Sequence, residues 1–355
     1  MRALVTGGIG FIGTNLSDRL LRDGHEVVLL DNFSRAGVLE NLDWLRAQHH
    51  MRMRFIEGDI RDREAVIHAM DGADTVFHLA AQVAVTTSVV DPQNDFSINA
   101  QGTLNVLEAA RQQKPMPVVL YTSTNKVYGE IEHERVVERS SRYEFESLPY
   151  GVPETCPLDF HSPYGCSKGT ADQYMHDYHR IYALPTIIFR MSCIYGPHQC
   201  GNEDQGWVAH FARTGLNAGH LTLYGDGKQV RDVLFVDDLI DLMLRARSNL
   251  ERTAGQIYNV GGGPENTISI WAELQGPLRQ LIGALPSVDY ADFRPGDQKI
   301  YVSDIRKAHQ HLGWKPQVGV VEGLRRLVDQ LKNKRSSESR GNGLADDKGT
   351  YSQAP

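Results

Sequence analysis

Cysteine is scarce in this chain of 355 residues, and its four cysteines show no C-x-x-C spacing. Neither a zinc site nor a disulfide framework is indicated, and we predict no metal centre. Long hydrophobic runs are also missing. No apolar stretch reaches the ~18 residues of a membrane span, and no signal peptide precedes the first predicted strand. We therefore expect a cytoplasmic protein.

An excess of basic charge is absent as well. The 37 lysines and arginines are outnumbered by 44 aspartates and glutamates, which gives a formal net charge of −7. This balance argues against a general nucleic-acid binder and against a membrane-surface protein. With 41% hydrophobic and 23% charged residues, the composition is typical of a globular protein with one large or two modest domains.

The first residues form a pattern typical of dinucleotide binding. A short apolar strand at 2–6 leads directly into a glycine-rich loop, and an amphipathic helix follows. Glycines here allow a tight turn and a close approach of the backbone to a pyrophosphate at the helix N-terminus. The loop supplies the predicted phosphate-binding residues: Gly7, Gly10, Phe11, Ile12 and Gly13.

A second predicted strand, at 26–30, ends in Asp31, which we expect to select the cofactor. A carboxylate at this point accepts hydrogen bonds from a ribose 2′-hydroxyl and repels a 2′-phosphate, so Asp31 favours NAD over NADP. Arg35 lies nearby and leaves NADP open as an alternative. The other residues predicted to contact the cofactor are Asn32, Asp59, Ile60 and Ala80.

Strands and helices then alternate along the chain. Further strands are predicted at 54–58, 74–78 and 118–122, with a long helix at about 94–113. This alternation predicts an α/β fold with a doubly wound parallel sheet that binds its ligand at the carboxyl ends of the strands. The fifth strand delivers Thr124 to that edge, where its hydroxyl can hydrogen-bond a substrate oxygen.

Tyr164 and Lys168 form a Tyr-x-x-x-Lys pair at the start of a predicted helix. Residues four apart lie on one helical face, so the lysine lies one turn from the phenol. A phenol with a pKa near ~10 is a poor base at neutral pH, and a neighbouring cation favours its ionised form. An isolated pair of this kind is more often a surface tyrosine and a solvated lysine. The preceding motifs favour the catalytic interpretation.

Together these motifs resemble the extended short-chain dehydrogenases/reductases that modify nucleotide sugars, and the resemblance extends to about residue 330. It implies a Rossmann fold, bound NAD, and Tyr164 as the base with Lys168 as its electrostatic and ribose-binding partner. Thr124 would orient the reacting oxygen. Arg231 and Arg294 would hold the diphosphate of the nucleotide sugar, a task that suits bidentate guanidinium groups.

Departures from the family pattern narrow the reaction. Sugar-nucleotide 4,6-dehydratases carry an acidic pair after this threonine, whereas Asn125 and Lys126 stand here, so we do not expect dehydration. The segments 122–129, 159–168 and 203–211 instead resemble the CDP-tyvelose (CDP-paratose) 2-epimerases. That resemblance implies a CDP-hexose substrate oxidised at C2 to a transient keto sugar and then reduced on the other face.

Two other reactions and one non-catalytic role stay open as alternatives. The same fold supports a 4-epimerase or a dehydrogenase that releases NADH, and free NADH accumulating with substrate would indicate the dehydrogenase. A dinucleotide sensor without activity is disfavoured, because such sensors usually lack an intact Tyr/Lys pair. The expected partners are a nucleotide-sugar substrate and further copies of the chain, with no nucleic acid and no membrane.

The point at which the βα alternation breaks predicts two domains. A cofactor-binding domain is expected at 1–186 with 231–260, and a smaller C-terminal substrate-binding domain at 187–230 with 261–333. The remaining segment, 334–355, has few large apolar side chains and is predicted to be a disordered tail.

Overall fold

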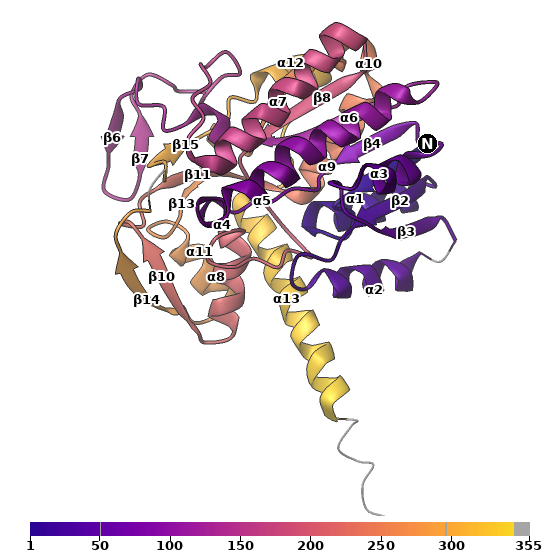
Figure 1. Ribbon diagram of the computed structural model, residues 1–355. Coiled ribbons are helices and arrows are strands. Elements are labelled where there is room, and N and C mark those ends of the chain that lie inside the picture. Colours follow the sequence, from indigo (N-terminus) through magenta and orange to yellow (C-terminus); the bar gives the residue numbers. More distant parts are fainter. Residues whose placement is uncertain (50, 295–296, 344–355) are drawn as a thin grey trace, which may run out of the picture.

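A parallel sheet of seven strands forms the centre of the computed structural model, which describes residues 1–49, 51–294 and 297–343 (Figure 1). Its order is β12-β8-β5-β4-β1-β2-β3, and every neighbouring pair runs parallel. The strands are β1 (Arg2–Thr6), β2 (Glu26–Asp31), β3 (Met53–Glu57), β4 (Thr75–His78), β5 (Val118–Thr124), β8 (Thr186–Met191) and β12 (Gln256–Val260). The predicted doubly wound α/β fold is confirmed.

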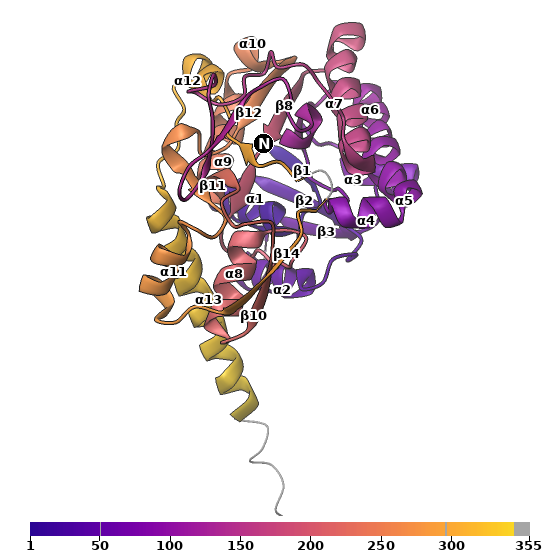
Figure 2. The same cartoon turned by 90° about the vertical axis from the view of Figure 1, so that its left-hand side faces the viewer.

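Both faces of this sheet are covered by helices, as Figure 2 shows. Successive side chains of β1 alternate between two apolar clusters, with Ala3 and Val5 in one and Leu4 in the other. The helices α1 (Phe11–Arg22), α2 (Val38–Gln48) and α9 (Val236–Ser248) pack into the first cluster. The helices α3 (Arg63–Met70), α6 (Gly102–Gln112) and α7 (Ser162–Tyr182) pack into the second. Burial on both faces explains why the sequences of these strands are continuous apolar runs.

The helix predicted at 94–113 is present as three consecutive segments. After α4 (Val85–Val90), the chain forms α5 (Pro92–Phe96), the π-helical turn η1 (Ser97–Gln101) and then α6. Such π turns are frequent at functional sites because they redirect side chains within a helix. Here the turn places Asn99 against Gln82 in the loop after β4, with two hydrogen bonds of 2.9 and 3.0 Å.

The C-terminal half builds smaller layers over the carboxyl edge of the main sheet. One small sheet joins β9 (Cys193–Tyr195), β11 (Val230–Phe235), β13 (Thr267–Ser269) and β15 (Ile300–Tyr301), and a second pairs β10 (His220–Tyr224) with β14 (Ser287–Ala291). The helices of this half are α8 (Trp207–Leu216), α10 (Leu250–Thr253), η3 (Pro264–Asn266), α11 (Gln275–Ile282), α12 (Arg306–Leu312) and α13 (Val320–Gly343). A short hairpin, β6 (Val136–Glu138) with β7 (Tyr143–Phe145), precedes α7.

The structure differs from the predicted domain boundaries in two places. β8 belongs to the central sheet, so the cofactor-binding part extends to Met191 rather than to residue 186. β11 pairs with strands of the C-terminal half, although 231–260 was predicted as a return to the cofactor domain. Only α9 and β12 from that segment join the central layers. An apolar run such as 233–236 can be buried in either sheet, and its sequence does not distinguish them.

The predicted tail begins inside α13, which the structure continues to Gly343. The rest of the tail, 344–355, lies outside the described residues. Among the helices of the described residues, none is both long and apolar enough to cross a membrane. The cytoplasmic location stays a prediction.

Candidate active site

The glycine loop between β1 and α1 forms a cradle at the carboxyl edge of the sheet. Gly7 has a φ of +68°, and a side chain there would meet the Ala80 nitrogen at 2.8 Å. A Cβ on Gly13 would lie 2.2 Å from the Gly7 carbonyl oxygen. No side chain caps α1, whose first amides therefore face the cradle. These features fit a pyrophosphate held by backbone amides at a helix N-terminus.

Thr6 and His78 hold the second wall of this cradle. The Thr6 hydroxyl accepts the amides of Leu79 and Ala80, both at 3.2 Å, and therefore donates to Nδ1 of His78 at 2.8 Å. Nε2 of His78 in turn meets the Thr103 hydroxyl at 2.9 Å. Burial lowers the pKa of His78 to about 3, so the ring is neutral. His78 therefore holds the end of β4 in place through its two hydrogen bonds.

Asp31, at the end of β2, lines a cavity together with the glycine cradle. Its carboxylate accepts hydrogen bonds from the amides of Phe33 (3.1 Å) and Ile9 (3.4 Å). Burial nevertheless raises the pKa of Asp31 above its usual value, and Arg35 lowers it only weakly. A carboxylate held in this way keeps acceptor capacity for the hydroxyls of a ribose.

Asp59 is already engaged by protein groups. Arg61 donates to it at 2.7 and 3.0 Å and Asn32 at 2.8 Å, and the Arg61 hydrogen bonds hold the pKa of Asp59 at about 2. The cavity that these residues line has a volume of about 520 Å³. Every residue predicted to bind the cofactor lines this cavity, with the exception of Lys168. The ten residues are Gly7, Gly10, Phe11, Ile12, Gly13, Asp31, Asn32, Asp59, Ile60 and Ala80.

A segment from the C-terminal half closes over this cavity. The carbonyl of Pro197 accepts a hydrogen bond from Asn15 of α1 at 2.9 Å, and that of His198 accepts one from Asn41 of α2 at 3.3 Å. The His198 ring packs on Trp44 with centroids 4.2 Å apart. The segment is thus attached to both helices that flank the cavity.

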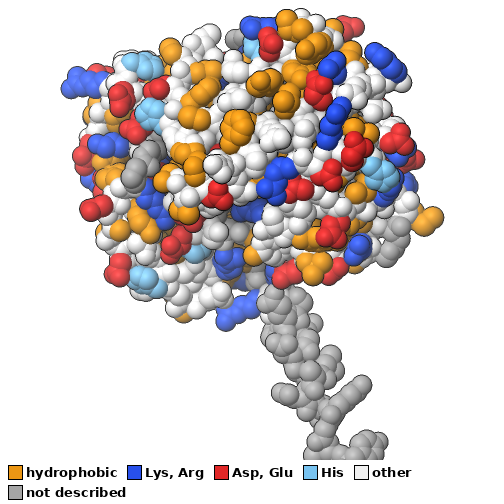
Figure 3. Space-filling model, in the orientation of Figure 1, with side chains coloured by type: hydrophobic (Ala, Val, Ile, Leu, Met, Phe, Trp, Pro, Cys, Tyr) orange, Lys and Arg blue, Asp and Glu red, His pale blue; other side chains and the backbone are white. Residues whose placement is uncertain are grey.

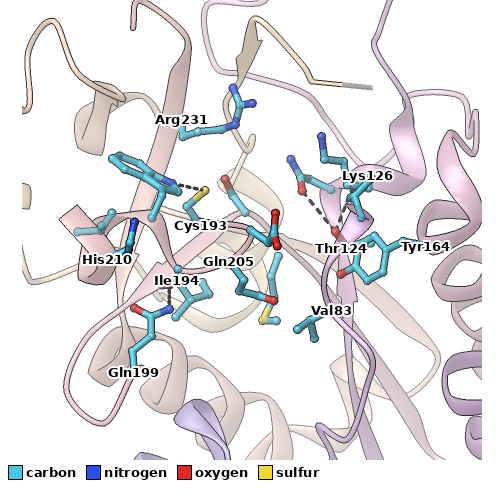
Figure 4. A pocket seen from close by; sticks show the side chains of 18 of the residues that line it. Val83, Thr124, Lys126, Tyr164, Cys193, Ile194, Gln199, Gln205, His210 and Arg231 are labelled. Carbon is cyan, nitrogen blue, oxygen red and sulfur yellow. Dashed lines mark hydrogen bonds between the residues drawn. The ribbon is translucent and has the colours of Figure 1, made fainter. Parts of the chain in front are cut away.

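A second cavity of about 370 Å³ adjoins the first and contains the predicted catalytic residues (Figure 4). Tyr164 comes from α7 and Thr124 from the end of β5, and their hydroxyls are hydrogen-bonded to each other. Lys168, one turn further along α7, is buried and donates to the Thr122 carbonyl at 2.6 Å. The three residues line one cavity, and their catalytic roles stay a prediction.

The pKa of Tyr164 lies above its usual value in this structure, whereas the sequence predicted that Lys168 would lower it. Burial raises the pKa of Tyr164 to about 12, and the Thr124 hydrogen bond offsets this only in part. Burial also lowers the pKa of Lys168 to about 7. Desolvation disfavours the charged form of both groups.

Sequence reasoning missed a buried polar network behind this pair. Asp95 is fully buried and accepts hydrogen bonds from Ser167 and Asn99. Asn99 also donates to Ser167 at 3.1 Å, and so connects the loop after β4 to α7. The signal present in the sequence is a pair of polar residues four apart, Asp95 and Asn99, within an otherwise amphipathic helix.

Arg231 and Arg294 line the far side of the second cavity, and each has an acidic neighbour. Arg231 lies 3.9 Å from Asp297, and Arg294 lies 3.1 Å from Asp204. The Arg294 guanidinium also stacks 3.6 Å from the centre of the Tyr224 ring. Within the described residues, no group of three or more His, Cys, Asp or Glu side chains could hold a metal ion.

This arrangement of sheet, cradle and Tyr–Lys–Thr group defines the class of protein, and comparison with known proteins agrees. Residues 4–327 match the family model described as GDP-mannose 4,6 dehydratase. The chain belongs to this family, the extended short-chain dehydrogenases/reductases that comprise NAD-dependent nucleotide-sugar epimerases and dehydratases.

Three relatives cover nearly the whole chain. CDP-paratose 2-epimerase of Salmonella typhi is 42% identical over 93% of this chain and 98% of its own. The crystal structure of UDP-glucose 4-epimerase with UDP-glucose from Thermotoga maritima has a TM-score of 0.81 at 31% identity, covering 94% of this chain and 100% of its own. UDP-glucose 4-epimerase of Thermus thermophilus in complex with NAD has a TM-score of 0.78 at 35% identity, covering 94% and 99%.

Proposed function

We propose that the protein is an NAD-dependent epimerase that inverts C2 of a CDP-linked deoxysugar, with CDP-paratose as the substrate. The observation that carries this proposal is the group at the end of β5. Thr124 faces Tyr164, and the two side chains after it are Asn125 and Lys126 rather than carboxylates. The dehydratases of this family carry two acidic side chains at these positions to eliminate water, and Asn125 and Lys126 supply no carboxyl group there. The sequence identity with CDP-paratose 2-epimerase supports C2 as the inverted carbon and cytosine as the nucleobase of the substrate.

The cofactor cavity supports NAD as the bound group. The backbone cradle fits its pyrophosphate, and Asp31 fits its adenosine ribose. Bound NAD would supply the hydride acceptor for the oxidation and the hydride donor for the return reduction. Lys168, which lines the second cavity, would bind the second ribose.

Tyr164 is the proton carrier in the proposed reaction. In its ionised form Tyr164 would accept the proton of the C2 hydroxyl as the C2–H bond breaks, and Thr124 would hold the same oxygen by a hydrogen bond. Because Tyr164 lies on one side of the cavity, inversion requires the keto sugar to turn over before the hydrogen returns. Arg231 and Arg294 permit this motion by holding the diphosphate while the sugar is loosely bound.

A 4-epimerase is the second candidate, and the likeness to two UDP-glucose 4-epimerase structures favours it. The two reactions are separated by incubating the protein with CDP-paratose and, in parallel, UDP-glucose in deuterated water, with NMR of every ring carbon. We expect inversion at C2 of CDP-paratose, no deuterium at the inverted carbon and no accumulation of free NADH. Solvent deuterium at C2 would rule out the Tyr164 mechanism, and inversion of UDP-glucose alone would identify a 4-epimerase.

A second copy of the chain is the expected partner. Apolar side chains gather on the face that carries α6 and α7 (Figure 3). On α4, α5 and α7 the exposed ones are Val89, Val90, Phe96, Tyr174, Ile181 and Tyr182. Such a surface fits a homo-oligomer contact. Light scattering after size exclusion tests it: Ile181→Glu should reduce the assembly, whereas Val321→Glu, similarly exposed on α13, should not.

A further inference from the structure

Lys126 lies in the substrate cavity, and the mechanism described above gives it no role. It belongs to the short helix η2 (Asn125–Tyr128), and its amide donates to the Thr124 hydroxyl at 3.2 Å. Figure 4 shows its side chain on the same wall as Thr124 and Tyr164, with Arg231 across the cavity. The amine is therefore close to both the reacting centre and the proposed diphosphate anchor.

The electrostatic surroundings of this amine contain groups of both signs, and the amine itself is buried. Charged and titratable side chains face it from β9, β11, the segment after Arg294 and its own loop: Cys193, Arg231, Asp297 and Glu130. Burial, followed by repulsion from Arg231, lowers the pKa of Lys126 to about 8. A bound phosphate would oppose both effects, because an opposite charge stabilises the ammonium form. Lys126 is thus suited to bind a phosphate group.

The chemistry of the sugar determines which phosphate Lys126 can reach. C2 is bonded directly to the anomeric carbon, which carries the diphosphate, whereas C4 lies on the opposite side of the ring. When C2 is held against Thr124 and Tyr164, the sugar-linked phosphate must lie next to them. When C4 is held there, the width of the ring separates the phosphate from the same residues.

We propose that Lys126 binds the sugar-linked phosphate of the substrate and thereby presents C2, rather than C4, to Thr124 and Tyr164. The selection of C2 rests on the proposed epimerase function. The phosphate contact can be tested by binding alone, so the phosphate contact and the proposed epimerase function can fail separately.

The binding experiment uses the NAD-loaded protein and two ligands that differ by one phosphate, CDP and CMP, in isothermal titration calorimetry. The terminal phosphate of CDP corresponds to the sugar-linked phosphate. In Lys126→Met we expect CDP affinity to fall about 10- to 100-fold, as for loss of a hydrogen bond to a charged group, with CMP affinity unchanged. Lys126→Arg, which keeps the charge, should retain CDP affinity within a few fold. Unchanged CDP affinity in Lys126→Met, or equal losses for CDP and CMP, would overturn the contact.

Lys228→Met serves as the matched control. Lys228 is bonded to Glu138 at 2.7 Å and does not line the cavity, so its loss removes the same charge elsewhere. CDP affinity in this variant should equal that of the wild type. A loss as large as that of Lys126→Met would show that net charge alone is responsible.

The selectivity experiment uses CDP-paratose, whose sugar carries hydroxyls at both C2 and C4. In Lys126→Met, kcat/KM for inversion at C2 should fall about 10- to 100-fold, and inversion at C4 should rise relative to it. A variant that binds CDP weakly but keeps the wild-type ratio of products would overturn the selective role. If the wild type does not invert C2, the proposed function fails, and the CDP and CMP measurements still decide the phosphate contact.

Discussion

The Lys168 amine lies 2.6 Å from the carbonyl oxygen of Thr122, and 4.2 Å from the centre of the Tyr121 ring. Both partners belong to β5, the strand that carries Thr124 at its end. The lysine is therefore fixed to the strand that carries Thr124, rather than to the phenol one turn away on α7. Burial is the largest influence on the pKa of Tyr164.

Tyr164→Phe should abolish turnover while the cofactor stays bound. The change removes the hydroxyl that carries the proton but leaves the ring and the buried packing in place. Loss of a positioned acid or base costs about 10² to 10⁴ in rate. The measurement is kcat with CDP-paratose together with the NAD content of the denatured protein. Tyr150→Phe, an exposed tyrosine, is the control. Near-wild-type activity in Tyr164→Phe would remove the basis of the mechanism.

Asp31→Ser should weaken NAD binding and relieve the rejection of NADP. The carboxylate accepts two backbone amides and remains an acceptor for the ribose hydroxyls, a role that serine fills only in part. Dissociation constants for NAD and NADP, measured on wild type and variant, give the preference of each protein for NAD over NADP. Chromatography of the cofactor released from the wild type provides an independent check. Recovery of mainly NADP would show that Arg35, rather than Asp31, dominates the choice.

Arg294→Ala should weaken binding of a free nucleoside diphosphate by about 10-fold or more, because a charge-assisted contact is lost. In the structure its guanidinium stacks on Tyr224 and pairs with Asp204, so it is held in place before the ligand binds. Arg294→Lys keeps the charge without the planar group and should recover only part of the affinity. Titration calorimetry with CDP measures both variants. Wild-type affinity in Arg294→Ala would remove this residue from the anchor.

The free energy of unfolding should fall as the pH drops from about 6.5 towards 4, and His198 should account for part of this fall. Burial lowers the pKa of His198 to about 4, so the folded state keeps the ring neutral. The unfolded chain takes up a proton near its normal pKa of ~6.5, which favours unfolding below that pH. The contribution of the neutral His198 ring to the free energy of unfolding is fully present above pH ~6.5 and is lost on acidification.

His198→Phe isolates this contribution, since it keeps a ring against Trp44 and removes the titration. Urea unfolding at pH 7.5 and 5.5 gives the free energy of unfolding at each pH. Between these two values it should fall by about 1 kcal/mol more in the wild type than in the variant. Equal losses in the two proteins would show that other groups control the acid response. Buried acids with raised pKa values, such as Asp31, act in the opposite direction and affect both proteins alike.

The parts of the site that the sequence predicted are those whose chemistry is local. The glycine loop, Asp31 and the Tyr164–Lys168 pair each depend on neighbours within one strand, one turn or one helix. The buried network of Asp95, Asn99 and Ser167 depends on two helices separated by about seventy residues, one of which contains a π turn. Periodicity does not reveal that contact. The raised pKa of Tyr164 could not be predicted for the same reason, because burial depends on the whole fold.

The segment that closes over the cofactor cavity, attached through Pro197 and His198 to α1 and α2, has a consequence for metabolism. In the proposed epimerase, a dinucleotide held in this cavity would stay bound from one turnover to the next. The proposed reaction would then neither consume nor produce free reduced cofactor. Its equilibrium position would be set by the two sugars alone and insulated from the redox balance of the cell.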